Sequence, residues 1–295
     1  MDRAKQSYIY AGLAIFFWST VPTAFKISLG ELDVMTMLTI AALTSTLVLI
    51  AVVLASKKWE LIIQSSRKDL INSALLGLIN PFIYYLILLW AYKLLPAQVA
   101  QPLNMIWPII LVFLSVPILG QKIARKSFVA LIISFAGVYI ISSQGNPFHF
   151  GGSDLTGVLL ATGSSFLWAF YFILNVRDRR DEAVKLFLNF FFGSIYLLAA
   201  MTITRNWHCT IGLKGALGSV YVGIFEMGIT FFFWLKALSL ATTTDKVSNL
   251  VYFAPFFSLI FVNYILKESV YYTTPAGLLL IVGGIIIQNR KSVRR

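Results

Sequence analysis

The sequence predicts an all-α, polytopic membrane protein with ten transmembrane helices. Its 295 residues are 58% hydrophobic and only 12% charged, which leaves too few polar side chains to cover a water-soluble globule of this size. The charges are gathered between long uncharged runs, and the two halves of the chain carry corresponding residues at a constant spacing. Composition, uncharged runs and internal repeat together predict this fold class.

Ten uncharged runs of about 20 residues, the length that a helix needs to cross roughly 30 Å of hydrocarbon, divide the chain. The runs are 6–25, 34–56, 70–92, 94–121, 127–153, 155–176, 186–204, 215–235, 247–266 and 269–289. Only Glu226 places a charge inside one of them. The fifth run is expected to end near Ser143, because the residues after it are rich in Gly, Asn and Pro.

The basic residues predict the orientation, because loops rich in Lys and Arg stay in the cytoplasm. With ten spans, both termini and most of the 24 Lys and Arg residues fall on one side. Both termini are therefore expected to be cytoplasmic. The net charge of +12 is spread over short groups that suit anionic lipid headgroups, and it forms no continuous patch. For this reason no nucleic-acid partner is expected.

An internal repeat predicts how the spans are organised. At a spacing of 147 residues, the pairs are Pro108 with Pro255, Leu119 with Leu266, Gln121 with Glu268, Leu131 with Leu278 and Gly137 with Gly284. With five spans per half, the second half enters the membrane in the opposite orientation. We expect a first five-helix repeat in 1–143, an outer linker in 144–154, and a second five-helix repeat with a basic cytoplasmic tail in 155–295. Inverted repeats of this kind are typical of secondary transporters that bind their solute between the halves.

Motifs for other chemistries are absent from the sequence. It contains no P-loop, HExxH or GxSxG motif. His149, His208 and the single Cys209 fall in predicted outer segments and are too few for a zinc site or a disulfide. We therefore expect no enzyme activity, metal or other cofactor. A channel, or an intramembrane enzyme built on Glu226 and Asp245, stays open as an alternative.

Several motifs resemble the drug/metabolite transporter superfamily of the EamA type. They are Gly12, Trp18-Ser19-Thr20, the segment 91–108, Gly120-Gln121, Gly137, Trp168, Pro255, Lys267-Glu268, Gly277 and Gly284. Within that superfamily, the segments 104–108 and 119–122 resemble aromatic amino acid exporters of the YddG type, whereas Lys267-Glu268 and Glu226 depart from that pattern. The resemblance implies a ten-helix basket with a central cavity in the cell inner (cytoplasmic) membrane. It also implies export of small metabolites without a bound cofactor.

Glu226 is the principal candidate for the site, because it lies within the eighth predicted span. An ionised carboxylate inside a bilayer costs several kcal/mol unless it meets water, a cation or a proton. It could bind a substrate ammonium group or carry a coupling proton; the alternative is a structural hydrogen bond. Aligning Ala91 with Ala237 places Asn80 opposite Glu226, and helical spacing puts Tyr84 on the face of Asn80.

Polar stripes and tryptophans complete the predicted site. Gln101 and Asn104 recur at helical spacing in the fourth span, as do Asp245, Ser248, Asn249 and Tyr252 in the ninth. The tryptophans that neighbour polar residues, and so could offer ring faces to a solute, are Trp18, Trp107 and Trp168. The predicted substrate-binding residues are Glu226, Asn80, Tyr84, Gln101, Asn104, Trp107, Trp168, Asn249, Tyr252 and Trp18.

The predicted function is export of small amphipathic metabolites by alternating access, with aromatic or other neutral amino acids as the first candidates. Its partners are then a small-molecule substrate, the lipid bilayer and a coupling proton at Glu226. The residues leave two further solute classes open. One is cationic drugs and polyamines, and the other is phosphorylated or nucleotide-type metabolites, for which Lys93, Lys236 or Lys246 would have to supply the positive charge.

Overall fold

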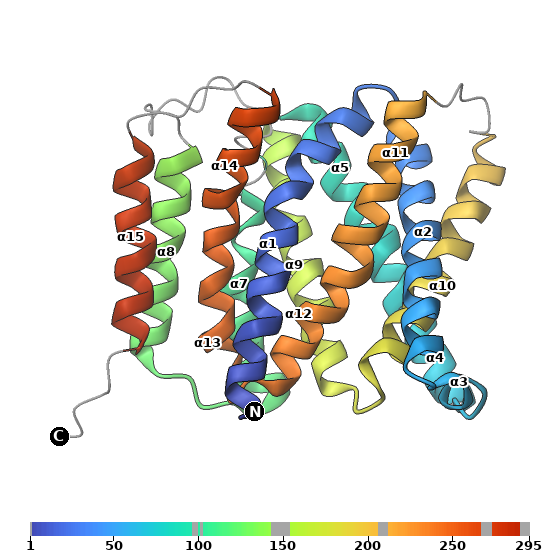
Figure 1. Cartoon of the computed structure of the whole chain (residues 1–295), viewed down its shortest axis with the longest axis horizontal. Helices are drawn as coiled ribbons and strands as arrows, with labels where there is room; N and C mark the ends of the chain where they lie inside the picture. Colours follow the sequence, from blue (N-terminus) through green and yellow to red (C-terminus); the bar gives the residue numbers. More distant parts are fainter. Residues whose placement is uncertain are drawn as a thin grey trace.

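The computed structural model describes residues 2–95, 100, 103–142, 154–205, 212–266 and 273–289, and all regular elements within them are helices (Figure 1). These are α1 (Arg3–Leu29), α2 (Val34–Ala55), α3 (Trp59–Ile63), α4 (Arg67–Gly77), η1 (Leu78–Ile83), α5 (Tyr84–Leu94), α7 (Trp107–Leu119), α8 (Arg125–Ser142), α9 (Leu155–Arg177), α10 (Glu182–Ile203), α11 (Leu213–Val222), η2 (Gly223–Gly228), α12 (Ile229–Leu240), α13 (Thr244–Ser248), η3 (Asn249–Tyr252), α14 (Phe253–Leu266) and α15 (Thr273–Asn289).

Seven described helical segments are long and apolar enough to cross a membrane. They are Arg3–Leu29, Val34–Ala55, Arg67–Leu94, Leu155–Arg177, Glu182–Ile203, Leu213–Leu240 and Thr244–Ile265. Two shorter apolar helices cover Trp107–Leu119 and Pro275–Gln288. The predicted all-helical, polytopic class is thus confirmed. The count of ten stays a prediction, because parts of the predicted fourth span and most of the linker 144–154 lie outside the described residues.

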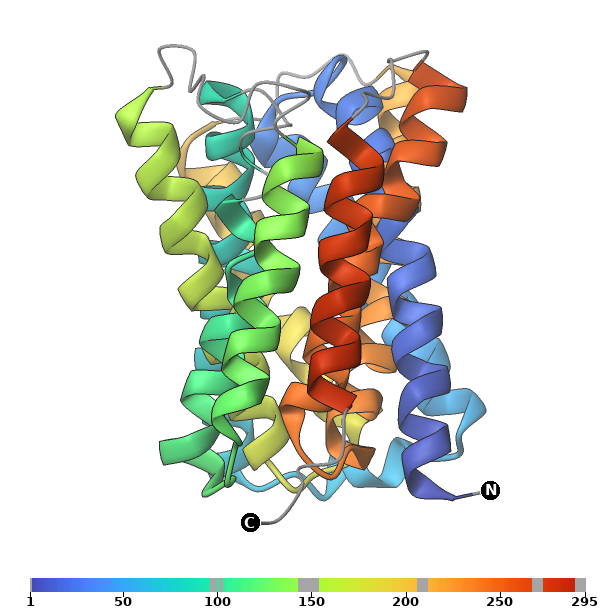
Figure 2. The same ribbon diagram turned by 90° about the vertical axis from the view of Figure 1, so that its left-hand side faces the viewer.

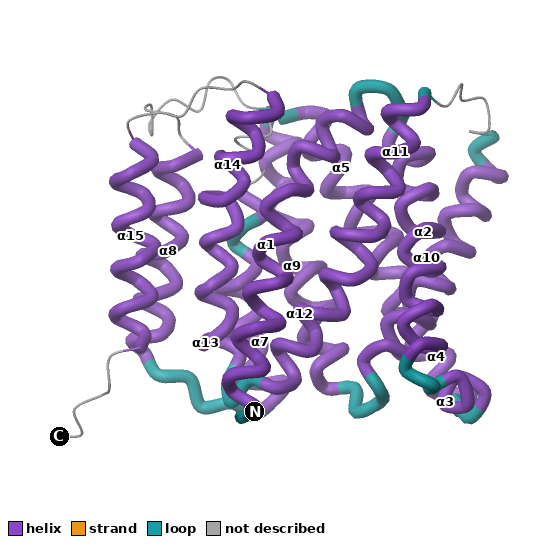
Figure 3. Tube along the Cα trace, viewed as in Figure 1, coloured by secondary structure: helices purple, strands orange, loops and turns teal. Residues whose placement is uncertain are grey.

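The helices run between two ends of the molecule (Figures 1 and 2). α1 begins and α15 finishes at the same end, which we call the N-terminal end; the other is called the opposite end. α8 and α15 lie side by side at one edge of the bundle, and α2, α4 and α10 lie at the other (Figure 1). In the tube representation, helices connected by short loops make up nearly all of the described chain (Figure 3).

Aspartates at the predicted loop boundaries fix where several helices begin. Asp33 Oδ1 accepts hydrogen bonds from the backbone N–H groups of Met35 and Thr36, 3.0 and 3.1 Å away, at the start of α2. Asp181 caps α10, and Asp154 caps α9, in the same way. The first N–H groups of a helix have no partner within the helix, so these carboxylates supply one. A capping aspartate just before an apolar run thus fixes the first residue of each of these three helices.

Helices from the two halves of the sequence pack against each other. α1 contacts α12 and α14, whereas α9 contacts α5 and α7. α8 and α15 pack along their length at small residues: a Cβ atom on Gly137 would clash with Ile281, and one on Gly284 would clash with the backbone of Ala130. These two glycines are one of the pairs that define the sequence repeat. Their small size permits the close approach of the two helices.

Among the described helices, two are interrupted at their centres. η1 separates α4 from α5, and η2 separates α11 from α12; each is a six-residue π-helical segment. Asn80, before Pro81, has non-helical dihedral angles (φ −149°, ψ 120°), and Gly228 departs from helical geometry in η2 (φ −88°, ψ −93°). Because π-helical segments widen the turn and release backbone groups, they are frequent at functional positions. Both predicted polar centres, Asn80 and Glu226, lie in these interruptions.

Candidate functional site

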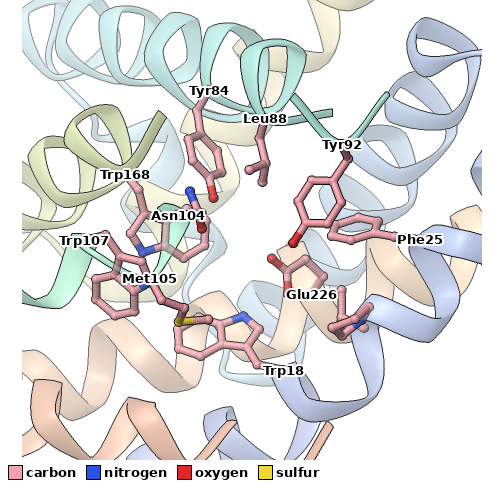
Figure 4. A pocket seen from close by; sticks show the side chains of 12 residues that line it. Trp18, Phe25, Tyr84, Leu88, Tyr92, Asn104, Met105, Trp107, Trp168 and Glu226 are labelled. Carbon is pink, nitrogen blue, oxygen red and sulfur yellow. The ribbon is translucent and has the colours of Figure 1, made fainter. Parts of the chain in front are cut away.

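A cavity lies between α1, α5, α7, α9 and η2 (Figure 4). Its volume is about 510 Å³, counted with the open space at its mouth. The lining residues are Trp18, Val21, Pro22, Phe25, Tyr84, Leu88, Tyr92, Asn104, Met105, Trp107, Trp168 and Glu226. Aromatic and apolar side chains therefore surround a few polar atoms, which is the usual composition of a small-molecule site.

Helical spacing explains which residues reach the cavity. Trp18, Val21, Pro22 and Phe25 follow the spacing of one face of α1. On α5, Tyr84, Leu88 and Tyr92 recur every four residues. From Trp18 and from Tyr84, α1 and α5 run toward the opposite end (Figure 1). The later lining residues, up to Phe25 and Tyr92, therefore carry the cavity from the middle of the bundle toward that end.

Among the described residues of the lining, Glu226 is the one acid, and only 7% of it is exposed. Its Oε1 accepts a hydrogen bond from the hydroxyl of Tyr85, at 2.8 Å. Among the described residues, no Lys or Arg forms a salt bridge with Glu226, and none lines the cavity. In Figure 4 the carboxylate and the hydroxyl group of Tyr92 point into the same space. A buried acid with one neutral partner can still accept a proton or a cationic group.

Four tryptophans from four helices pack around the inner part of the cavity. The ring centroids of Trp18, Trp107 and Trp168 lie 5.9 to 6.1 Å apart. Trp234 lies 5.3 Å from Trp18 and 5.5 Å from Trp107. The indole N–H groups of Trp18, Trp168 and Trp234 are buried and have no hydrogen-bond partner within the described segments. Because buried donors normally have partners, the two unpaired donors of the lining, Trp18 and Trp168, are available to a ligand.

Aromatic packing closes the cavity toward the N-terminal end. Phe231 is fully buried on α12, and its ring lies 5.0 Å from that of Trp168 and 5.4 Å from that of Phe190. Nearer the start of α1, the hydroxyl of Ser7 donates to the backbone oxygen of Ala237 at 2.8 Å. α1 and α12 therefore remain in contact from the tryptophans to their ends at this side.

Ion pairs tie several helices to the α9–α10 loop at the N-terminal end. Lys58 binds Asp181 at 2.6 Å, and Lys236 binds Glu182 at 3.1 Å. In the same loop, Arg180 binds Asp178 at 2.6 Å and also donates to the backbone oxygen of Asp69 on α4. These contacts join α10 to the α2–α3 connection, to α12 and to α4. They hold together the end of the bundle at which the cavity is closed.

Charge and hydrogen bonding control the ionisation of Asp178, which lies outside the membrane-spanning segments. Burial alone would raise the pKa of Asp178. The hydrogen bonds from Arg180, with the charges of Arg180 and Lys185, outweigh burial and hold the pKa below its usual value. Lys185 is itself buried, and its Nζ donates to the backbone oxygens of Asn175 and Asp178, each at 2.7 Å. The loop is therefore held by charged groups on both sides.

The structure brings six of the ten predicted site residues into one cavity. These are Glu226, Tyr84, Asn104, Trp107, Trp168 and Trp18. Asn80 is fully buried, has no hydrogen-bond partner for either amide atom among the described residues and does not line the cavity. Asn249 and Tyr252 belong to a separate polar cluster between α8, η3 and α15. Gln101 lies outside the described residues.

Sequence reasoning overlooked three residues that matter here. Tyr85 donates the hydrogen bond to Glu226, Tyr92 lines the cavity, and Trp234 completes the tryptophan cluster. Tyr92 could have been found, because it lies two turns beyond Tyr84 on α5. Tyr85 could not be found, because helical spacing counted from Asn80 does not predict which α5 residues share its face. The backbone at Asn80, in η1, departs from a helix.

Comparison with known proteins identifies the family. The model of the EamA-like transporter family matches residues 5–143 and 155–290. An uncharacterized transporter of Clostridium kluyveri is 26% identical over 290 residues, which cover 96% of this chain and 93% of the relative. The uncharacterized transporter YvbV of Bacillus subtilis is 29% identical over 222 residues, covering 73% of this chain and 70% of the relative.

Two further likenesses agree with that match. Protein PecM of Dickeya dadantii is 22% identical over 220 residues, covering 72% of this chain and 71% of the relative. A protein of known crystal structure superimposes with a TM-score of 0.82 at 20% identity, covering 98% of this chain and 99% of the other, and so shares the fold. Because the family model matches both halves of the sequence, the chain belongs to the EamA-like transporter family.

Proposed function

We propose that this transporter exports small amphipathic solutes that carry an amino group, with aromatic and other neutral amino acids as the first candidates. The observation that carries the proposal is the buried carboxylate of Glu226 in an aromatic cavity whose described lining contains no basic residue. An ammonium group would supply the positive charge that this carboxylate lacks. Hydrogen bonds to charged groups contribute about 1.5–3 kcal/mol each, enough to select amines.

The surrounding side chains support a cation that is attached to an apolar body. Tyr85 fixes the carboxylate by donating to Oε1, which leaves Oε2 for the solute. The ring faces of Trp18, Trp107 and Trp168 would cover the apolar part and attract positive charge. A solute with both features would satisfy the acid and displace water from the rings in a single binding event.

The solute's carboxylate group distinguishes the first candidate from the second. The unpaired indole N–H groups of Trp18 and Trp168 are the donors that an amino acid carboxylate would need. Cationic drugs and polyamines are the second candidate, because Glu226 and the rings serve them equally well. A phosphorylated or nucleotide-type metabolite finds no support, because its charge would face Glu226 without a basic side chain in the described lining.

Alternating access is the proposed mechanism. The two halves, 1–143 and 155–295, would act as inverted five-helix repeats in the cell inner membrane, with the N-terminal end in the cytoplasm. The cavity extends toward the opposite end, and aromatic packing with the α9–α10 ion pairs closes the N-terminal end, so the conformation described suits release to the outside. Rocking of the halves would break these contacts and open the site to the cytoplasm. Exchange of a proton at Glu226 would couple this motion to the proton gradient.

The test is uptake into everted membrane vesicles, in which export from the cytoplasm becomes uptake. Three solutes of one skeleton separate the candidates: phenylalanine, phenethylamine, which lacks the carboxylate, and phenylpyruvate, which lacks the amine. We expect phenylalanine to be taken up and to accelerate counterflow, and phenylpyruvate to have no effect. Phenethylamine transported as well as phenylalanine would favour the cationic candidate. Transport of phenylpyruvate alone would contradict the proposal.

The matched variants are Glu226→Gln and Glu60→Gln, since Glu60 is an exposed acid on α3. Glu226→Gln keeps the size of the side chain and removes its charge, so uptake should fall roughly 10- to 100-fold, the equivalent of about 1.5–3 kcal/mol. Glu60→Gln should transport normally. If Glu226→Gln left both uptake and its pH dependence unchanged, the proposed role of this residue would be wrong.

A further inference from the structure

A second buried acid lies outside the cavity, on the segment α13–η3, which packs against α8 and α15. Figures 1 and 2 show α8 and α15 side by side at this edge of the bundle. Asp245, on α13, is 6% exposed. Its Oδ2 accepts hydrogen bonds from Ser127 Oγ on α8 at 2.6 Å and from Gln288 Nε2 on α15 at 3.2 Å. Three helical segments thus meet at this carboxylate. None of these residues lines the cavity.

The hydrogen bonds fix the orientation of the amide groups around Asp245. Gln288 Nε2 also donates to the backbone oxygen of Asp245 at 2.6 Å, so Gln288 Oε1 is left as an acceptor. Asn249 Nδ2 donates to Gln288 Oε1 at 2.9 Å. Asn249 must therefore present its own Oδ1 elsewhere. Because one Gln288 amide contacts both residues, the side chains of Asp245 and Asn249 lie next to each other.

One helical face carries four buried oxygen atoms that have no hydrogen-bond partner in the part of the chain that the structure describes. They are Asp245 Oδ1, Ser248 Oγ, Asn249 Oδ1 and Tyr252 Oη. The spacing of three, one and three residues places all four on the same side of α13–η3. Two of them, the carboxylate and the amide oxygen, can only accept. Buried acceptors without donors are costly, and a positively charged ligand would satisfy the oxygens on this face.

We propose that this oxygen-lined face is a binding site for a sodium ion. Hard oxygen ligands suit small hard cations, and the single carboxylate balances one positive charge. Among the described residues, Asp245 forms no salt bridge, and its neighbour Lys246 is exposed. Divalent cations are normally held by more carboxylates than one. A monovalent ion therefore fits the charge and the ligand type.

The backbone of this segment supports the proposal. α13 spans only five residues and continues as the 3₁₀ turn η3 before α14 begins. Irregular helical segments of this kind often coordinate coupling ions in transporters. η3 contacts α1, α8 and α15. Since α1 carries Trp18 and Phe25 into the cavity, an ion at Asp245 would act on a helix that also holds the solute.

The test measures thermal unfolding of the purified full-length protein in sodium, potassium or choline chloride at equal ionic strength, without any solute. Sodium at ten times its dissociation constant should raise the unfolding midpoint by about 3–6 °C, and potassium and choline should not. Asp245→Asn should abolish the shift. Asp154→Asn, at an exposed helix cap where Asn serves as well as Asp, should retain it.

A second variant keeps the proposal testable if Asp245→Asn does not fold. Ser248 Oγ has no hydrogen-bond partner among the described residues, so Ser248→Ala removes no protein hydrogen bond and should fold normally. A sodium ligand at this position predicts that Ser248→Ala raises the sodium concentration needed for half the shift roughly tenfold, whereas a purely structural serine predicts no change. Equal midpoints in all three salts, or the same shift produced by acidification without sodium, would overturn the proposal. Glu226→Gln should keep the sodium shift, which makes this test independent of the proposed solute site.

Discussion

The two interrupted helices, α4–η1–α5 and α11–η2–α12, share an architecture and differ in the polar residue at the interruption. Each interruption packs against the second helix of the other half: η1 contacts α10 and η2 contacts α2. Three residues after a closely packed glycine, the first has Asn80 and the second has Glu226. Asn80 is buried without a partner, whereas Glu226 faces the cavity and is held by Tyr85. The architecture is kept on both sides, and the proposed solute chemistry is confined to one.

The α1–α2 and α9–α10 loops also correspond to each other, because each carries an acid that binds an interrupted helix. Glu31, in the α1–α2 loop, accepts a hydrogen bond from the backbone N–H of Gly215 on α11 at 2.8 Å. Asp178, in the α9–α10 loop, accepts one from Asn72 Nδ2 on α4 at 3.2 Å. At each end, an acid from one half therefore holds the interrupted helix of the other. Only Asp178 also has an arginine partner among the described ion pairs.

The largest expected effect comes from the glycines at which these helices meet. A Cβ atom on Gly77 would clash with the backbone of Asn189 and Gly193, and one on Gly223 would clash with Ala41 and Thr44. Since backbone atoms cannot turn aside, Gly77→Ala and Gly223→Ala should each destabilise the protein by about 2 kcal/mol or more. The measurement is the unfolding midpoint of the purified variants.

The matched control for both is Gly12→Ala on α1, where a Cβ atom would meet nothing within 4 Å. This change should be neutral or stabilising by up to about 1 kcal/mol, because alanine favours the helix. If Gly77→Ala and Gly223→Ala differed widely, the two contacts would not be equivalent. If both behaved as Gly12→Ala does, the close packing would not limit stability.

The next effect comes from Lys185, a buried cation on α10. Lys185 is 2% exposed and donates to two backbone oxygens at the end of α9. Lys185→Met keeps the apolar stem and leaves these oxygens without their donor, so we expect a loss of about 2–4 kcal/mol. Lys68→Met, at an exposed position on α4, should change stability by less than about 0.5 kcal/mol. Equal unfolding midpoints for the two variants would show that Lys185 has no structural role.

The sequence was sufficient for the helical membrane class, because composition and uncharged runs report burial in lipid directly. It also selected Glu226 and the tryptophans Trp18, Trp107 and Trp168, because a midplane charge and aromatics beside polar residues are visible without a structure. It could not separate Asn249 and Tyr252 from this group. Their polar stripe has the correct period, but only tertiary packing reveals that the stripe faces α8 and α15.

A smaller effect is expected at Asn80, which lies in η1 as Glu226 lies in η2. Its amide is fully buried and unpaired, and it does not line the cavity. Asn80→Leu removes a polar group that has no partner and nearly preserves the volume, so stability should stay constant or rise by about 1 kcal/mol. Uptake into vesicles should be retained, in contrast to Glu226→Gln. Loss of uptake with an unchanged unfolding midpoint would instead return Asn80 to the solute site.

The smallest expected effect is a pH dependence at Asp178. Its pKa in the folded protein is lowered, so its contribution to stability is complete above the pKa of the unfolded chain, near 3.9, and is lost as the pH falls through the folded value. Asp178→Asn should therefore lower the free energy of unfolding at pH 7 by about 1 kcal/mol and leave it nearly unchanged near pH 2. Glu31→Gln, which removes an acid with no ion pair among the described residues, should have a smaller effect at pH 7. Equal effects of the two variants would mean that the ion pair with Arg180 adds nothing to the hydrogen bond, and the two loops would then be equivalent in energy as well as in position.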